Sequence, residues 1–394
     1  MKLFAGKTSS MSRCLALLVV SASLILAVGS ASADEPPHHP VNFTLYYPVG
    51  TNQNADISTN FRLSLIYGRV GSVRGLDLNT GVSVVQRDFG GVQGTLLYSQ
   101  VDGDFGGLAM TGILNNFKSD VSGAQISGLV NVTRGHMTGF QWASLFNYVE
   151  GGLSGVQLSS VLNSNQGEGG FLQLASVANI NEGDFHGAQI GGVNLATGWV
   201  SGFQLGLANT AYRVHGVQAG LVNMTNEARG VQIGALNLAV QNEGMPLGLV
   251  NIDETTGDAD WLIAGSNLAA VSTGLRTTVN RWYSELSVGY GDQQGDVEES
   301  VFLAWNYGRA FPLGRTWSLG VDLGYVHIIP EKRDDPTIND ALHYAIQARA
   351  KAEVKLGKTL AIFAGGGVSS VYSSYKSNAK QETEPHVVLG VSLF

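Results

Sequence analysis

The sequence has almost no cysteine. The single one, Cys14, stands at the start of an apolar run from Leu15 to Val28, not at its end, so it does not fit a lipoprotein attachment site. If the leading segment is removed, the mature chain has no thiol, no disulfide and no cysteine metal site. Packing and backbone pairing must then supply its stability.

That leading segment, 1–33, has the order of a secretory signal. Basic residues come first, the apolar run follows, and Ala31-Ser32-Ala33 offers a small-x-small cleavage site before Asp34. The basic residues are Lys2, Lys7 and Arg13. Met11 is an alternative start that keeps one of them. The apolar run is short for a membrane-spanning helix, so we expect export and cleavage.

Charge is also scarce, and basic charge more so. Charged residues make up 14% of the chain. Three of the 23 basic residues lie in the signal, which leaves 20 against 31 acidic ones and a net charge of about −11. This balance excludes nucleic acid as an expected partner. Proline (9 residues) and helical periodicity are rare while glycine (52 residues) is abundant, which favours an all-β fold.

What the sequence does contain is a repeat over 77–252. Each unit reads apolar-x-Gly-apolar-Gln-apolar-small-small-apolar-apolar-Asn, as in Met137 to Asn147. Asp77 and Ala109 occupy the Gln place in two early units. The Gln positions recur first every 16 and finally every 14 residues, and they are Gln93, Gln125, Gln141, Gln157, Gln173, Gln189, Gln204, Gln218 and Gln232.

Asparagine closes each unit. The positions are Asn131, Asn147, Asn163, Asn179, Asn194, Asn209, Asn223, Asn237 and Asn251. Gln and Asn are six residues apart in the long units and five apart in the short ones. On one straight strand that change would move Asn to the other face, so we expect Asn at a corner.

Two architectures compete for this repeat. Stacking identical units in parallel would form Gln and Asn ladders that satisfy their own amides, which favours a β-solenoid. An 11-residue stretch plus a turn also matches a strand of one large antiparallel barrel. The fixed Gly before Gln predicts close backbone approach or a special dihedral in either case. We favour the solenoid.

The repeat is flanked by other segments. A proline-rich lead at 34–40 is expected to be disordered, and its His38-His39 pair has no partner in register for a metal. Strand-like runs at 41–76 precede the repeat, and an acidic linker at 253–260 follows it.

The region 261–394 alternates apolar and polar residues, as Trp317 to Tyr325 shows, which indicates antiparallel strands resembling an outer-membrane barrel. Aromatic residues near the strand ends and a terminal Phe394 agree, although Phe394 is out of phase with the stronger apolar face at Val387 to Leu393. We count about six strands here. The smallest such barrel needs eight, which the runs at 41–47 and 61–67 could supply.

Units such as Gly216-Val-Gln-Ala-Gly-Leu-Val-Asn223 and Gly230-Val-Gln-Ile-Gly-Ala-Leu-Asn237 resemble the surface-repeat proteins first recognised in Leptospira and widespread in Gram-negative bacteria. The resemblance covers roughly 41–290. It implies an exported protein of the outer membrane or cell surface, and it carries no catalytic residue.

No stretch predicts an active site. Gly365-Gly-Gly367 lacks the helix and acidic partner of a phosphate loop, and Gly-x-Ser-x-Gly does not occur. The turns at Asp102-Gly-Asp104 and Glu182-Gly-Asp184 lack a full calcium pattern. We therefore expect no enzyme and no cofactor.

Three functions remain open for such a chain: a structural or adhesive outer-membrane protein, a porin-like channel, or an outer-membrane enzyme. The first is favoured. Its expected partners are outer-membrane lipid and the insertion machinery, and its extracellular ligand stays unknown.

Overall fold

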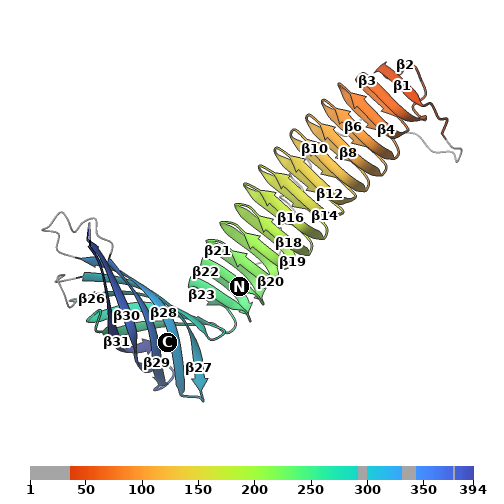
Figure 1. The fold of residues 1–394 in the computed structure, drawn as a ribbon. Coiled ribbons are helices and arrows are strands. Elements are labelled where there is room, and N and C mark those ends of the chain that lie inside the picture. The colour runs from red at the N-terminus through yellow and green to blue at the C-terminus, as the bar shows by residue number, and fades with distance from the viewer. Residues whose placement is uncertain (1–35, 292–299, 331–342, 376–377) are drawn as a thin grey trace.

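The computed structural model describes residues 36–291, 300–330, 343–375 and 378–394. The signal-like segment lies outside them. The described chain forms a long stack of parallel strands followed by a closed antiparallel barrel (Figure 1). The all-β prediction is confirmed. The described residues contain no helix long and apolar enough to cross a bilayer.

Each turn of the stack contains two strands and two corners. In one turn, β12 (His136–Ala143) carries Gln141 and β13 (Phe146–Val149) carries Asn147. β12 pairs in parallel with β10 (Val121–Ser127) and β14 (Gly152–Ser159), which sets Gln125, Gln141 and Gln157 in register. About 13 such turns form a β-solenoid. The alternative of one large antiparallel barrel is wrong, because successive units run parallel.

The two corners of each turn differ in the repeat positions that they connect. The Gln–Asn corner lies between the Gln and the Asn of one unit, and the Asn–Gln corner leads on to the next Gln. Strands on the Gln side are β4 (Ser72–Asn79), β6 (Phe89–Thr95), β8 (Phe105–Thr111), β10, β12, β14, β16 (Gly169–Ala175) and β18 (Phe185–Ile190). Strands on the Asn side are β5 (Val82–Val85), β7 (Tyr98–Val101), β9 (Leu114–Phe117), β11 (Val130–Thr133), β13, β15 (Leu162–Asn165), β17 (Ala178–Asn181) and β21 (Val222–Ala228).

Shorter units lose residues only at the corners. The first loss, between Gln189 and Asn194, shortens the Gln–Asn corner, and the second shortens the Asn–Gln corner before Gln218. Longer strands then run through a corner and serve both sides: β19 (Val193–Leu205), β20 (Ala208–Ala219), β22 (Val231–Asn242) and β23 (Met245–Asp253). Gln204 still pairs with Gln218 in register, so each side chain keeps its face.

The glycine two residues before Gln is required for the two reasons predicted, a special dihedral and a close backbone approach. Gly139 has a φ of 126°, and a Cβ there would lie 2.1 Å from the carbonyl oxygen of Gly123 one turn earlier. Only glycine tolerates both conditions without strain. Phe171 occupies this column with a φ of 87° and its side chain exposed, so one turn carries a strained residue.

The chain before the repeat already belongs to the solenoid. β1 (Val41–Tyr46) pairs in parallel with β3 (Ser58–Val70), and β2 (Val49–Gly50) folds back on β1. The expectation that the runs at 41–47 and 61–67 complete the barrel is therefore wrong. Part of the lead expected to be disordered is also placed, since His38 forms a parallel bridge to Ser58.

The C-terminal region closes a barrel of eight strands by itself. They are β24 (Asp258–Ser266), β25 (Val271–Val279), β26 (Trp282–Gly291), β27 (Ser300–Leu313), β28 (Trp317–Pro330), β29 (His343–Lys355), β30 (Leu360–Tyr375) and β31 (Asn378–Leu393). β24 pairs with β31 to close the ring. Because β24 starts at Asp258, the expected linker at 253–260 is shorter, and Asp260 belongs to the barrel wall.

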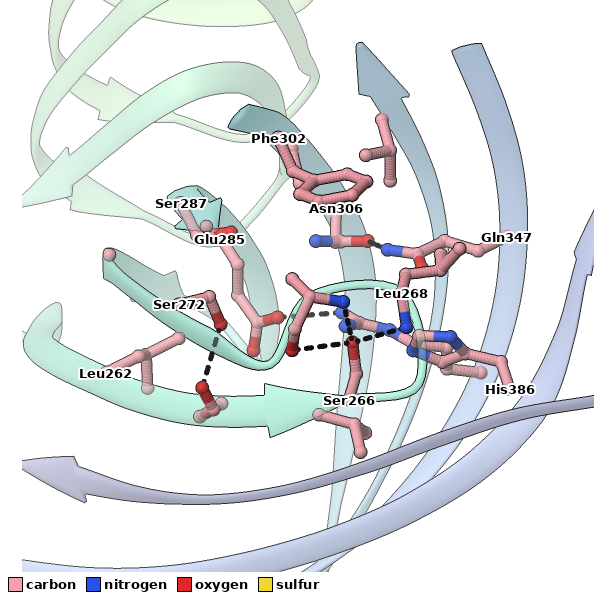
Figure 2. A pocket seen from close by; sticks show the side chains of 18 of the residues that line it. Leu262, Ser266, Leu268, Ser272, Glu285, Ser287, Phe302, Asn306, Gln347 and His386 are labelled. Atoms are coloured by element: carbon pink, nitrogen blue, oxygen red, sulfur yellow. Dashed lines mark hydrogen bonds and ion pairs between the residues drawn. The ribbon is translucent and has the colours of Figure 1, made fainter. Parts of the chain in front are cut away.

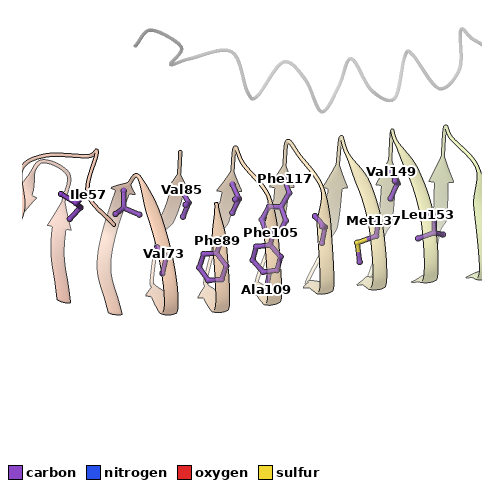
Figure 3. Close-up of a cluster of buried hydrophobic side chains, with 13 residues drawn as sticks. Ile57, Val73, Val85, Phe89, Phe105, Ala109, Phe117, Met137, Val149 and Leu153 are labelled. Carbon is purple, nitrogen blue, oxygen red and sulfur yellow. The ribbon is translucent and has the colours of Figure 1, made fainter. Parts of the chain in front are cut away.

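The solenoid has a divided interior. Toward the Asn–Gln corner, apolar side chains from successive turns stack on one another, as Phe89 and Phe105 do with ring centres 4.9 Å apart (Figure 3). Toward the Gln–Asn corner the buried side chains are the amides of the repeat. A buried polar row next to an apolar one is stable only if its hydrogen bonds are complete.

Candidate functional site

The Gln column forms a ladder along the solenoid axis. The Nε2 of each Gln donates to the Oε1 of the Gln one turn earlier, from Gln141 through Gln232, over 2.6–2.9 Å. These side chains are almost completely buried. The ladder predicted from the repeat is present, and its role is structural because both functions of each internal amide are used.

The Asn column forms a second ladder of opposite polarity. The Nδ2 of each Asn donates to the Oδ1 of the Asn one turn later, as Asn147 does to Asn163 over 2.9 Å. The same Nδ2 also donates to a carbonyl at the next Gln–Asn corner, that of Leu158 for Asn147, over 2.7 Å. Asn thus lies just past the corner and fixes it. The opposed amide rows cancel much of each other's dipole.

The N-terminal end of the polar row is closed by an ion pair. Arg62 Nε lies 2.6 Å from Asp77 Oδ1 with both side chains fully buried, and Gln93 donates to Asp77 over 3.0 Å. Burial alone would raise the pKa of Asp77. The Arg62 guanidinium and the hydrogen bonds from Arg62 and Gln93 outweigh it and hold the pKa below its usual value.

The barrel interior holds a second polar network. Glu285 on β26 binds Lys351 Nζ over 2.5 Å and Arg349 Nη2 over 2.8 Å, both from β29. Asp322 on β28 binds the same two cations over 2.7 and 3.0 Å. Nearby, Arg276 joins Asp260 and Glu353, each over 2.6 Å. Four carboxylates and three cations from strands β24, β25, β26, β28 and β29 therefore pair with one another across the barrel.

Beside this network lies a small cavity. Its volume of about 60 Å³ has room for a few water molecules. Figure 2 shows Glu285, Asn306, Gln347 and His386 around it, with Gln347 donating to Asn306 over 2.5 Å. In a barrel of eight strands the interior is just wide enough for side chains to fill it.

The outer surface of the barrel is apolar. Along each strand, residues that alternate with the interior set face outward, such as Leu323 (67% exposed), Ile346 and Leu389. Aromatic side chains lie toward the two rims: Trp261, Trp282, Tyr307 and Trp317 toward one, and Tyr290, Tyr344 and Tyr372 toward the other, while Trp305 and Tyr325 pair in register between them. Phe394 follows the last strand, donating its N–H to the Thr359 carbonyl, and its ring lies 4.9 Å from Lys355 Nζ.

Other sequence candidates have ordinary surroundings. Asp102 forms a surface ion pair with Lys118 over 2.7 Å, and Gly365 to Gly367 lie within β30. Among the residues the structure describes, no group of three or more His, Cys, Asp or Glu side chains is placed to hold a metal ion.

Sequence reasoning missed most of the barrel network. The polar face of β29, with Arg349, Lys351 and Glu353, was visible as alternation, but Glu285 and Arg276 gave no signal of their own. Their partners are 66 and 77 residues away, at Lys351 and Glu353. Only the closure of the barrel brings them together.

The chain matches no family model, and neither curated proteins nor solved structures show a significant match to it.

Proposed function

We propose that this chain is an exported outer-membrane protein in which the barrel is the anchor and the solenoid is a structural or adhesive arm. One observation carries the proposal. The barrel presents apolar side chains outward and a set of paired charges inward, which is the arrangement that a bilayer requires and water does not.

The belt is also too large for an exposed surface in water. Its apolar residues surround the barrel on all eight strands, whereas a soluble monomer rarely exposes a contiguous patch above about 600 Å². The strands have 9 to 16 residues, enough for the 9 to 11 or so that a transmembrane strand needs. The aromatic rims correspond to the girdles at the two membrane interfaces.

The signal-like segment 1–33 and the resemblance to surface-repeat proteins support the same proposal. Lipid and the insertion machinery would be its partners in the membrane, and we assign no catalytic role or cofactor. A porin-like channel is the weaker candidate, because ion pairs between Glu285, Asp322, Arg349 and Lys351 fill the lumen. Planar-bilayer recording should give no steady conductance.

Two leucines on the outer surface test the anchor. Leu323 faces outward near the middle of β28, and Leu313, equally exposed, ends β27 at the rim. In a bilayer, Leu323→Arg should cost about 2–4 kcal/mol and Leu313→Arg about 0–1 kcal/mol. Refolding yield into phospholipid vesicles, scored by heat-modifiable gel mobility, measures both. Equal behaviour of the two variants, with the protein recovered free of membranes, would contradict the proposal.

A further inference from the structure

The outer surface of the solenoid is apolar along one edge. Aliphatic residues occupy the tip of the Gln–Asn corner in turn after turn, and they are 40–64% exposed: Ile66, Leu97, Ile113, Leu129, Val177, Leu207, Leu221 and Leu249. A second exposed column stands one residue after the Gln place, which Asp77 and Ala109 occupy in two turns: Leu78, Met110, Trp142, Leu174, Leu205 and Ile233. This second column points outward because the preceding residue points inward.

Charge is separated from this edge. From Val92 to Ile252, no Asp, Glu, Lys or Arg occurs between the residue before each Gln and the residue after the following Asn. Charged residues gather at the Asn–Gln corner instead, where Asp102, Lys118, Arg134, Glu150 and Glu182 follow one another along the arm. The solenoid is therefore amphipathic across its whole length.

The apolar edge is large enough to indicate a binding surface. Some 12 steps of about 4.8 Å separate Ile66 from Leu249, so the edge is roughly 60 Å long, and two columns make it about 10 Å wide. An area of about 600 Å² equals the largest patch that a typical soluble monomer exposes. Small residues (Gly81, Gly192 and Ala235) take the tip in three turns, and its straight form suits an extended apolar surface.

The last turn shows where this edge points. At the Asn–Gln corner, Asn280 in the turn between β25 and β26 donates to the carbonyls of Glu243 and Gly244 over 2.7 and 3.0 Å. At the Gln–Asn corner, Ser284 donates to the carbonyl of Leu249 over 2.8 Å. Ser284 lies on β26, four residues after Asn280, and is therefore about 13 Å further from the rim along the barrel wall.

The apolar edge consequently joins the apolar belt. The indole of Trp305, on the outer barrel surface, donates to the same Ser284 hydroxyl over 2.9 Å. Thr277, also on the outer surface, accepts from the N–H of Asn251 over 3.2 Å. The solenoid leaves the side of the barrel wall and does not continue along its strands (Figure 1). Its charged corner faces the rim, and its aliphatic corner faces the belt.

That rim has the shorter connections. Two, three and four residues join β25 to β26, β27 to β28 and β29 to β30, and both the entry into β24 and the end of the chain lie there. In outer-membrane barrels the short turns face the periplasm.

We propose that the Gln–Asn corner is a membrane-docking edge that seats the solenoid along the periplasmic leaflet of the bilayer holding the barrel, as the structural and not the adhesive form of the arm. This inference rests on the proposed anchor. The occupant is phospholipid, because the edge is continuous with the belt that lipid would cover. An apolar edge without charge would enter the boundary between headgroups and acyl chains, as interfacial amphipathic segments do.

The absence of cysteine after Cys14 gives a clean test. Single-cysteine variants of the mature chain, each carrying an environment-sensitive fluorophore, are reconstituted in phosphatidylethanolamine–phosphatidylglycerol vesicles that contain acyl-chain quencher lipids. Leu129→Cys and Leu207→Cys report the Gln–Asn corner, Glu150→Cys and Gln166→Cys report the Asn–Gln corner, and Leu323→Cys reports the belt. We expect quenching at Leu129 and Leu207 to approach that at Leu323 and to exceed that at Glu150 and Gln166 several-fold.

Other outcomes separate the two proposals. Quenching at Leu323 alone leaves the anchor standing and overturns the docking edge. Unquenched probes at Leu129 that crosslink to a second copy assign the edge to self-association instead. Absence of quenching at Leu323 overturns both the anchor and the docking edge.

Two triple variants test the apolar edge directly. Replacing Leu129, Val177 and Leu221 by Glu should remove quenching at Leu207, while a matched triple replacement of Glu150, Gln166 and Glu182 by Ser should not.

Discussion

The amide nitrogen of Gln141 donates to Gln125 over 2.6 Å, whereas the amide nitrogen of Gln125 has no partner among the described residues. The place it would bind one turn earlier is occupied by Ala109, which is fully buried. The same turn carries Phe117 where neighbouring turns have Val101 and Thr133. A small residue and a large one thus share that turn, and the ladder stops there.

This arrangement predicts a repair that needs two changes. Ala109→Gln alone should destabilise by about 1–3 kcal/mol, because its side chain competes with Phe117 for the interior. Ala109→Gln with Phe117→Val should recover that loss and add a hydrogen bond worth about 1 kcal/mol. Urea unfolding of the wild type, the two single variants and the double variant measures the coupling energy between the two side chains. Additive effects would mean that the two side chains do not share space.

Inside the ladder the effect should be a loss. Gln157→Leu removes the partner of Gln141 Oε1 and of Gln173 Nε2, and each orphaned buried group costs about 1–3 kcal/mol. Gln241→Leu is the matched control, because Gln241 is exposed and its side chain donates to the exposed Glu243. Amide hydrogen exchange should speed up in the turns next to residue 157 and stay unchanged in the control. Similar exchange in both variants would show that the ladder contributes little.

The ion pair at Asp77 predicts a pH dependence with a definite sign. Its pKa is depressed in the folded state, so it contributes stability that is present above the unfolded value near 4 and is lost as pH falls through the folded pKa. Asp77→Asn leaves Arg62 buried without its carboxylate and should cost about 3–5 kcal/mol at neutral pH.

The difference in unfolding free energy between wild type and Asp77→Asn should therefore shrink below about pH 4. The paired replacement Arg62→Met with Asp77→Leu should be far milder than either single change. A wild-type advantage that is constant between pH 7 and pH 2 would contradict the assigned ionisation.

Much of the solenoid could be predicted from the sequence because each turn repeats the same chemistry. Gln141 predicts its own partner, which is another Gln one period away. The outward direction of Trp142 and Leu129 could not be predicted in the same way. Apolar residues usually face a core, and here a buried amide row reverses that rule on one half of each turn.

The barrel was harder to predict for a different reason. Asp260 belongs to an acidic run and reads as linker, yet it lies in β24 beside Arg276. Its burial depends on a partner that pattern alone does not identify. The start of β24 was therefore placed in the linker, and the count of about six strands fell short of eight.

Phe171 predicts a stabilising change. It holds a positive φ in a column where every register neighbour is glycine, and its ring is 69% exposed, so it gains little by burial. Phe171→Gly should raise stability by about 1 kcal/mol through relief of backbone strain. Gly155→Phe, the reverse change one turn earlier, should lower it. Thermal unfolding of both variants gives the signs, and a loss in Phe171→Gly would indicate that the exposed ring makes contacts that matter.

Removal of whole turns tests the solenoid as a modular stack. Deleting 125–156 takes out two units of 16 residues and joins Ala124 to Gln157, which keeps every column in register. Each turn contacts mainly its neighbours, so folding should persist and the arm should shorten by about 10 Å. The unpartnered amide nitrogen is then that of Gln157 instead of Gln125, so the unfolding free energy should change little.

Deleting 125–148 is the out-of-register control. It removes one and a half units, joins Val149 to Ala124, and should prevent folding because Gln and Asn faces would then be mismatched. Small-angle scattering in detergent gives the length, and circular dichroism melts give the stability. If both deletions behaved alike, the ladders could not be what sets the register.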